Sequence, residues 1–332
     1  MRKISYNDAI REATKQSMEE DDSVFVYGEG VDFATGVFGI ALDLAKNFGD
    51  ERVFDMPMSE NAMTGVGIGA AIAGMRPIMV HQRIDFMLLA LDQIANHAAK
   101  ACYMWGGESC VPFVTRAIVG RGWGQGAQHS QSFHSIFAHF PGLKVVLPSN
   151  AYDAKGLLIQ SIRDNNPIIF VEHKFLFNQE EEVPEEMYTI PLGKGRVVRE
   201  GNDITVVAYS QMILEAEKAA EELSHNGIDV EIIDPRTSYP LDEKIIADSV
   251  KKTGRLVIAD IDWLYCGISA EISALISDKY FDYLKAPIKR VGLPHTTHPC
   301  SYSLEDVFYP DKDTIITSVN EIIKPQVVEN ER

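Results

Sequence analysis

Hydrophobic positions in the first half of the chain alternate between two periods. Residues 6–18 place apolar side chains at the spacing of an amphipathic helix, and residues 23–27 follow as a short, β-rich run. Similar runs recur along the chain, and most are too continuously apolar to leave a polar face toward water. They predict interior parallel strands, at residues 53–56, 76–80, 112–119, 143–147 and 167–172.

Helical patterns separate these predicted strands, at residues 59–74, 85–104 and 150–163. Ser59 and Asn150 stand at the starts of the first and last of these helices, where N-cap residues are preferred. Because strands and helices alternate, the pattern predicts an α/β fold with layers of helices on mostly parallel sheets.

The hydrophobic period breaks at residues 178–188, where five glutamates and a proline occur within eleven residues. This composition predicts a solvated connector, and we expect a domain boundary there, with domains at residues 1–185 and 186–332. Beyond the connector the alternation resumes in a smaller α/β unit. Its predicted strands lie at residues 204–209, 230–233 and 256–259, and its predicted helices lie at residues 211–224 and 242–252.

Length and charge narrow the class of protein. The chain has 332 residues, which is more than one hydrophobic core usually serves. Its 48 acidic and 31 basic residues give a net charge of −17, which disfavours nucleic acid and anionic membranes as partners. Four cysteines without a C-x-x-C pair fit a reducing compartment, and the first residues lack the apolar segment of an export signal. We therefore expect a cytoplasmic protein without membrane insertion.

A glycine-rich string at residues 65–70 matches a permissive dinucleotide-binding pattern, with Asp85 at about the expected distance downstream. A dinucleotide site begins with a glycine in the turn directly after a strand. Gly65 instead follows Ser59 by six residues, so it lies inside the predicted helix. We interpret these small residues as close helix packing and keep a NAD site as the less favoured alternative.

Glu60 and Phe86 each allow two interpretations. Glu60 follows a predicted strand and helix cap, where α/β proteins place ligand groups, but a glutamate in a first helical turn is also favoured by the helix dipole. Phe86 begins an apolar helix, and core packing is the common fate of such a residue. The residues alone leave both alternatives open.

A second glycine-rich stretch, residues 120–132, follows a buried strand and contains His129. Alternating glycines permit close approach of a ligand and backbone angles that other residues avoid. A histidine in such a loop exchanges protons near neutral pH. We therefore favour a functional His129 over a structural one.

Taken together, these stretches resemble the β subunit of the thiamine diphosphate-dependent E1 component of 2-oxoacid dehydrogenase complexes, within the transketolase-like superfamily. The resemblance runs nearly end to end and implies a pyrimidine-type thiamine diphosphate-binding domain and a transketolase C-terminal-like domain. It implies decarboxylation of a 2-oxo acid and acyl transfer to a lipoyl carrier. Its motifs are residues 27–31, 52–55 leading to Ser59-Glu60, 70–77, 92–96, 126–131, 141–146, 152–157 and 234–237.

The resemblance also implies roles for single residues. Glu60 becomes the carboxylate that shares a proton with N1′ of the aminopyrimidine, so that the cofactor activates its own C2 position. Phe86 offers an aromatic face to that ring, and Glu29, in the first motif, is a further cofactor-binding candidate. His129 is placed beside the reacting centre, where it positions the substrate or assists acyl transfer.

The family keeps its magnesium and diphosphate motif on an α subunit, as Gly-Asp-Gly followed by paired asparagines. Residues 49–51, Gly-Asp-Glu, lack the second glycine, so we interpret them as a turn. The resemblance therefore implies magnesium ligands on an α partner, an α2β2 assembly and a lipoyl-bearing E2. The chain itself is expected to hold the pyrimidine half of the site.

The family often carries a potassium site near residues 161–166. Candidate oxygen ligands are carboxylate, amide and carbonyl groups of Phe113, Ser161, Ile162, Asp164 and Asn166. The alternative is a helix that ends in ordinary polar capping residues. The sequence favours neither.

Departures from the family pattern concern the substrate. His81, Gln82 and Arg83 replace the apolar or acidic residues that usually lead into Phe86, Trp123 enters the glycine-rich loop, and residues 295–300 are also less typical. Arg83 is a candidate partner for a phosphate or carboxylate of a larger substrate, or for a salt bridge.

These departures keep two other functions open. One is a transketolase-like enzyme that transfers a carbon fragment to a sugar or another acceptor. The other is a catalytically inactive assembly subunit, against which the retained Glu60 and His129 argue.

Overall fold

The computed structural model describes residues 2–33 and 38–323 and divides the chain into two compact units. The first unit comprises Met1–Lys194 with Arg236–Pro240, and the second comprises Gly195–Pro235 with Leu241–Arg332. The domain division expected after residue 185 stays a prediction. Within residues 2–33 and 38–323, no helix has the length and apolar character that crossing a bilayer requires.

A seven-stranded sheet forms the centre of the first unit, in the order β12-β6-β7-β5-β4-β2-β3. All neighbouring strands are parallel except β12 and β6, and every residue of β5 and β7 is buried, so both faces of the sheet are covered. The strands are β2 (Val24–Gly28), β3 (Val53–Asp55), β4 (Arg76–His81), β5 (Val114–Val119), β6 (Lys144–Val146), β7 (Ile168–His173) and β12 (Thr237–Tyr239).

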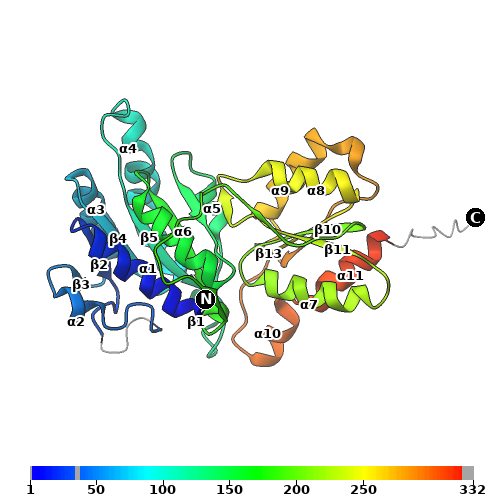
Figure 1. Cartoon of the computed structure of the whole chain (residues 1–332), viewed down its shortest axis with the longest axis horizontal. Helices are drawn as coiled ribbons and strands as arrows, with labels where there is room; N and C mark the ends of the chain where they lie inside the picture. The colour runs from blue at the N-terminus through cyan, green and yellow to red at the C-terminus, as the bar shows by residue number, and fades with distance from the viewer. Residues whose placement is uncertain (1, 34–37, 324–332) are drawn as a thin grey trace, which may run out of the picture. The chain divides into compact units, whose positions relative to one another are not determined.

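Helices of the first unit follow most of the predicted positions, and Figure 1 shows α1 and α6 lying side by side in front of the sheet. Asn150 caps α6, because its side-chain oxygen accepts a hydrogen bond from the Asp153 amide at 2.7 Å. The α-helices are α1 (Tyr6–Glu20), α2 (Leu44–Phe48), α3 (Glu60–Ile72), α4 (Ala99–Met104), α5 (His134–Ala138) and α6 (Ala151–Arg163). Short 3-10 turns lie at Gly126–Gln128 and Lys174–Leu176.

The helix predicted over residues 85–104 is present, but it is not one regular α-helix. The chain is helical from residue 84 to residue 104, as a 3-10 segment at Ile84–Ala90, a π segment at Gln93–Ala98 and then α4. Asp85, near the start of this stretch, accepts hydrogen bonds from Gln131 of a distant loop. The hydrophobic period carries no information about such contacts, which favour a local 3-10 segment.

The solvated connector predicted at residues 178–188 contains a strand instead. β8 (Glu180–Val183) pairs antiparallel with β1 (Arg2–Ser5), with Lys3 opposite Glu182. Opposite charges across an antiparallel pair stabilise it, so the acidic run is matched by the basic N-terminal strand.

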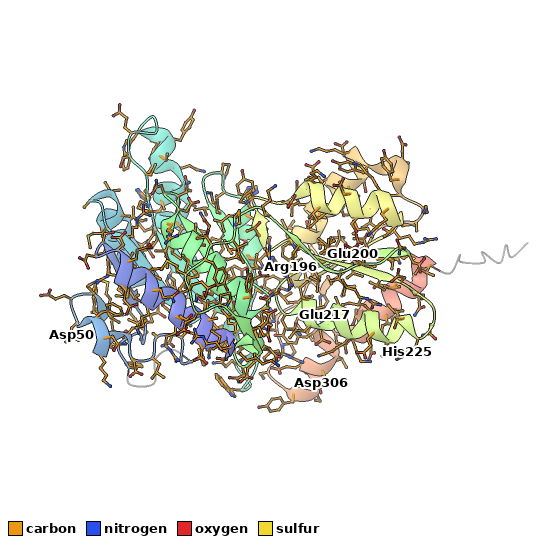
Figure 2. All side chains as sticks on the ribbon, viewed as in Figure 1. Asp50, Arg196, Glu200, Glu217, His225 and Asp306 are labelled. Carbon is orange, nitrogen blue, oxygen red and sulfur yellow. The ribbon has the colours of Figure 1, made fainter. Side chains whose placement is uncertain are left out.

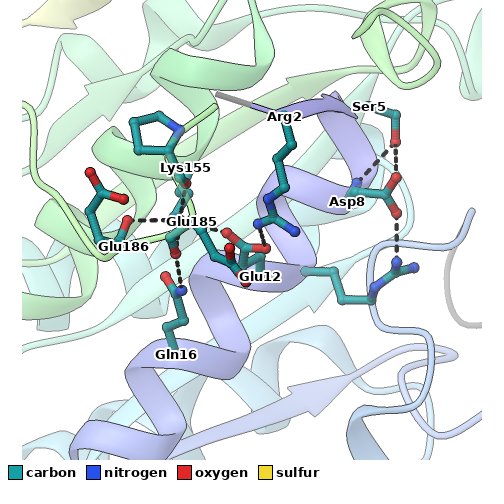
Figure 3. Close-up of polar contacts among 10 residues, drawn as sticks. Arg2, Ser5, Asp8, Glu12, Gln16, Lys155, Glu185 and Glu186 are labelled. Carbon is teal, nitrogen blue, oxygen red and sulfur yellow. Dashed lines mark hydrogen bonds and ion pairs between the residues drawn. The ribbon is translucent and has the colours of Figure 1, made fainter. Parts of the chain in front are cut away.

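Lys155 on α6 anchors this region to α1 (Figure 3). Its fully buried ammonium group donates to Glu12 at 2.5 Å and to the backbone carbonyls of Pro184, Glu185 and Glu186 at 2.8 to 3.1 Å. A buried charge is tolerated only with such partners, so Lys155 fixes the glutamate-rich segment against the two helices.

Gly67 confirms the packing interpretation of the glycine string, because it lies inside α3 and not in a turn after a strand. A Cβ atom at Gly67 would stand 2.0 Å from the Tyr27 hydroxyl oxygen and 2.7 Å from the Phe113 ring. That hydroxyl donates to the Met63 carbonyl at 2.9 Å. The glycine therefore lets α3 approach the sheet closely, and the NAD alternative is wrong.

The second unit is a smaller α/β layer structure around a five-stranded sheet, in the order β14-β13-β10-β11-β9. Only β9 is antiparallel to its neighbour. Figure 1 shows α8 and α9 on one face of this sheet and α7 and α11 on the other. The elements are β9 (Arg196–Arg199), β10 (Ile204–Ala208), α7 (Met212–Ser224), β11 (Val230–Asp234), α8 (Glu243–Thr253), β13 (Leu256–Trp263), α9 (Ile268–Lys279), β14 (Lys289–Leu293), α10 (Tyr302–Phe308) and α11 (Lys312–Ile323).

Both sheets are thus mostly parallel, which confirms the predicted fold class. Residues 295–300 of the second unit are mostly exposed, with one exception. His298 is buried, and its Nδ1 is 2.7 Å from the Tyr309 hydroxyl oxygen.

Candidate active site

Neighbouring parallel strands of the first unit end at one edge of the sheet, and the candidate residues follow those ends. In α/β sheets ligands bind outside the carboxyl ends of the strands. Glu29 follows β2, Glu60 follows β3, the segment from Arg83 to Phe86 follows β4, residues 120–131 follow β5, and His173 ends β7.

Glu60 is the first residue of α3, and its side chain is half-buried. Within residues 2–33 and 38–323, no side chain forms a hydrogen bond or ion pair with its carboxylate. The neighbouring Asn61 amide donates to the Leu89 carbonyl at 3.4 Å, which ties the start of α3 to the segment that carries Phe86. The carboxylate is therefore available to a ligand at a helix N-terminus.

Phe86 and His129 lie against each other, although 43 positions separate them in the sequence. Their ring centroids are 5.3 Å apart with an interplanar angle of 82°, an edge-to-face contact. Both side chains are half-buried, so each keeps surface for a ligand. The structure thus brings together an aromatic ring and a loop histidine that the resemblance had placed in one site.

Glu29 forms part of a buried polar group with spare hydrogen-bonding capacity. Its Oε2 accepts from the Gln82 amide at 3.3 Å, while its Oε1 stands 3.6 Å from Nδ1 of the fully buried His81. Among the described residues, neither Glu29 Oε1 nor the two ring nitrogens of His81 have a hydrogen-bond partner. Buried polar atoms normally have partners, so these atoms mark a place for a ligand or water.

Asp55 holds the turn after Glu29. Its carboxylate accepts hydrogen bonds from the backbone amides of Gly30 at 2.8 Å and Val31 at 2.6 Å. The start of the loop that follows β2 is therefore fixed to the end of β3.

Arg83 is buried, with 3% of its surface exposed. Its guanidinium donates to the Gly120 carbonyl at 2.8 Å and to Oε1 of Gln125. The Arg83 side chain therefore binds the glycine-rich loop of its own chain. Its proposed recognition of a substrate anion stays a prediction, and these contacts do not support it.

Asp85 is a site residue that sequence reasoning considered only as the acid of a NAD site. Its Oδ1 accepts from the Gln131 side chain at 2.7 Å and from the Gln131 amide at 3.3 Å. Burial raises the pKa of Asp85, and the bonds from Gln131 oppose that rise. No local pattern indicates this contact, because its partners are 46 positions apart.

His173, at the end of β7, was not singled out from the sequence. Burial, with added repulsion from Lys174, Arg83 and Arg121, lowers the pKa of His173 to about 3. Its Nδ1 accepts from the Phe175 amide at 3.3 Å, and Lys174 Nζ lies 4.3 Å from the centre of the Trp123 ring. At the end of β7, positively charged side chains therefore surround a neutral His173 imidazole.

We expect His173 to make the first unit less stable in acid. Its pKa of about 3 in the folded chain lies below the ordinary 6.5, so the unfolded chain binds more protons between these values and stability falls with falling pH. In urea unfolding, the free energy of unfolding should fall between pH 7.5 and 5.5 by on the order of 1 kcal/mol more in the wild type than in His173→Gln. His225→Gln, at an exposed position labelled in Figure 2, is the control and should match the wild type. Equal pH dependence in wild type and His173→Gln would contradict this assignment.

Oxygens of four predicted potassium ligands, Phe113, Ser161, Ile162 and Asp164, have protein partners in this structure. Arg76 donates to the carbonyls of Ile162 at 2.9 Å and Asp164 at 3.2 Å. The Asp164 carboxylate accepts from Lys144 at 2.6 Å and from Asn166 at 2.8 and 2.9 Å. The Phe113 carbonyl accepts from Ile168 at 2.8 Å, and the Ser161 hydroxyl donates to the Leu157 carbonyl at 2.7 Å. Potassium at this corner stays a prediction, and Arg76 and Lys144 already supply positive charge there.

Known proteins resemble the chain along nearly its whole length. Residues 2–179 match the transketolase pyrimidine binding domain, and residues 193–315 match the transketolase C-terminal domain. The pyruvate dehydrogenase E1 component subunit beta of Rickettsia felis is 40% identical over 96% of this chain and 98% of the relative. The chain belongs to the E1 β-subunit family of 2-oxoacid dehydrogenases.

This E1 β-family chain is also similar to two subunits named acetoin:2,6-dichlorophenolindophenol oxidoreductase subunit beta. Those of Bacillus subtilis and Cupriavidus necator are 44% and 46% identical, each over 97% of this chain and 98% of the relative. Among solved structures, a split gene transketolase described as an inactive beta4 tetramer has a TM-score of 0.78 at 21% identity, covering 96% of this chain and 98% of that one. That likeness concerns the fold.

These matches confirm the family and enzyme class that the sequence motifs predicted. They place the E1 β-family chain among proteins named as β subunits, which work with a partner subunit. The roles of Glu29, Glu60, Arg83, Phe86 and His129 stay predictions.

Proposed function

We propose that this chain supplies the pyrimidine half of a thiamine diphosphate site in a 2-oxoacid dehydrogenase E1, with Glu60 as the carboxylate that meets N1′ of the aminopyrimidine. The observation that carries the proposal is the half-buried Glu60 carboxylate, which has no partner in the described residues and begins a helix at the carboxyl edge of the sheet. A carboxylate in this position shares a proton with the ring nitrogen N1′ of the aminopyrimidine.

Other residues at the same edge of the sheet fit such a ring. Phe86 presents a half-buried aromatic surface, which restricts the orientation of a flat heterocycle. Glu29 and His81 offer buried polar atoms without partners in the described chain, and these suit the polar edge of the same ring. When bound, thiamine diphosphate supplies the carbon nucleophile that attacks the carbonyl of a 2-oxo acid.

His129 is the residue we propose for the substrate. Its ring touches Phe86 at the edge-to-face distance of 5.3 Å, so it stands beside the surface that would orient the cofactor. A half-buried imidazole there is placed to donate a hydrogen bond to a substrate oxygen or to accept one from it.

The diphosphate and its magnesium belong, in this proposal, to an α partner. Residues 49–51 form a turn between α2 and β3, where Asp50 is labelled in Figure 2, and do not form a diphosphate motif. An α2β2 assembly, a lipoyl-bearing E2 acceptor and a cytoplasmic location complete the proposal. Potassium is an optional structural ion.

Acetoin is a second candidate substrate. The relatives named for acetoin are 44% and 46% identical to this chain, against 39% to 43% for those named for pyruvate. The alternative of carbon-fragment transfer to a sugar depends on Arg83 as a partner for a substrate anion. The Arg83 guanidinium instead binds Gly120 and Gln125 of its own chain, so this structure does not favour that alternative.

Reconstitution with an E1 α-type subunit from the same organism tests the proposal. Calorimetric titration should show thiamine diphosphate and magnesium binding to the mixed complex and not to either chain alone. Dichlorophenolindophenol reduction, measured in parallel with pyruvate, 2-oxoisovalerate and acetoin, should then identify the substrate class. A mixed complex that assembles but does not bind the cofactor would refute the proposal and favour an inactive assembly subunit.

A further inference from the structure

We propose that Arg83 and Asp85 are positioning residues that hold the glycine-rich loop, residues 120–131, so that His129 stays against Phe86. The role in catalysis rests on the proposed function, whereas the hold on the loop stands on contacts within this chain. We call the two contacts Arg83–Gln125 and Asp85–Gln131 the loop clamp.

The loop needs such a clamp because its own backbone is permissive. Gly120, Gly122, Gly124 and Gly126 all have positive φ values, of 105°, 138°, 67° and 58°. Glycine loses more conformational freedom than other residues when it is fixed, so an isolated loop of this composition samples many shapes. The only regular structure in the described loop is one 3-10 turn at Gly126–Gln128.

Arg83 joins two points of the loop that are five positions apart. One nitrogen of its guanidinium donates to the Gly120 carbonyl at 2.8 Å, and another donates to Gln125 Oε1. Because 3% of Arg83 is exposed, water competes little for these bonds. The rigid fork of the guanidinium therefore fixes the distance between the start of the loop and its middle.

Asp85 holds the other side of His129. Its Oδ1 accepts both the side-chain amide of Gln131 at 2.7 Å and the backbone amide of the same residue at 3.3 Å. Asp85 is also buried, with 8% of its surface exposed. The loop is thus pinned four residues before His129 and two residues after it.

Both halves of the clamp come from the chain segment that also carries Phe86. Arg83, Asp85 and Phe86 lie within four positions at the start of one 3-10 segment, so their relative positions are set locally. His129 is therefore placed relative to Phe86 by a single short element. A misplacement of about 1 Å in such a group costs on the order of a hundredfold in rate, which explains the need for two fixed contacts.

The first experiment measures the loop directly. In the reconstituted complex, Gln125→Ala and Gln131→Ala should raise amide hydrogen exchange in peptides covering residues 120–131 by about tenfold, because each removes one contact. Peptides of α8 should not change, and neither should the loop in Gln211→Ala, a control in the second unit. This measurement needs no cofactor, so it tests the clamp even if the proposed function fails. Unchanged exchange in both loop variants would overturn the proposal.

The second experiment separates positioning from general loss of structure. Gln131→Ala should lower turnover about tenfold to a hundredfold while proton exchange at C2 of the cofactor, which depends on Glu60, changes less than twofold. In a His129→Ala background, Gln131→Ala should lower turnover no further, because the clamp acts through His129. Asp85→Asn, which keeps an acceptor oxygen, should retain more turnover than Asp85→Ala. If Gln131→Ala lowered turnover by the same factor with and without His129, the proposal would be overturned.

Discussion

A Glu60→Gln variant should lose proton exchange at C2 of thiamine diphosphate and turnover together, by about a hundredfold to ten-thousandfold. Glutamine keeps the size of the side chain and its hydrogen bonding, but it does not share a proton with N1′ as a carboxylate does. The Glu60 carboxylate has no partner in the described residues, so its replacement breaks no contact there and assembly should be unaffected. The measurement is hydrogen/deuterium exchange at C2 in the reconstituted complex, at equal cofactor occupancy.

Glu243→Gln provides the matched control, since Glu243 is also the first residue of a helix, in the second unit. It should leave C2 exchange at the wild-type rate. If Glu60 acts only on the helix dipole, its replacement should change stability by about 0.3 to 1 kcal/mol and spare catalysis. Wild-type C2 exchange in Glu60→Gln would therefore remove Glu60 from the mechanism.

An Arg116→Met variant should destabilise the first unit by about 3 to 5 kcal/mol. Arg116 on β5 binds Glu172 on β7 through two hydrogen bonds of 2.6 and 3.0 Å, and both side chains are fully buried. Loss of the guanidinium leaves the Glu172 carboxylate in the core without its counter-charge. An uncompensated buried charge strongly destabilises the folded state. Urea unfolding of wild type and variant at pH 7.5 measures the difference.

The double variant Arg116→Met/Glu172→Leu should recover most of that loss, because apolar replacement of both partners leaves no buried charge. Lys244→Met removes one partner of the exposed Lys244–Asp248 pair on α8 and should have no measurable effect. A single Arg116→Met variant as stable as wild type would show that Glu172 finds another partner or takes up a proton.

The positions of most strands and helices in both units were predictable because each repeats a local pattern. Residues 150–163 show this well, since the cap at Asn150 and the apolar period together define α6. Residues 85–104 show the limit, because tertiary contacts wind their start into a 3-10 segment. Residues 180–183 form a strand only through their partner β1, which a local pattern does not reveal.

The candidate site was predictable as far as its residues stand in recognisable motifs. Glu60, Phe86 and His129 were identified in this way, and the structure brings Phe86 and His129 into contact. The contacts of Arg83 were not predictable, because Gly120 and Gln125 lie 37 and 42 positions away. A long cationic side chain suggested a substrate anion, whereas burial directs it to a backbone carbonyl and an amide of its own chain.

The seventh strand of the first sheet has a consequence for how this protein is made and divided. β12 reaches the sheet from residues 237–239, after more than forty residues that belong to the other unit. On the ribosome, the first sheet therefore lacks its outermost strand until about three quarters of the polypeptide has been synthesised. A gene truncated after codon 194 would encode a product with β6 as a bare edge, ready to pair with another copy. Separate production of the first unit would need β12 grafted back through a linker.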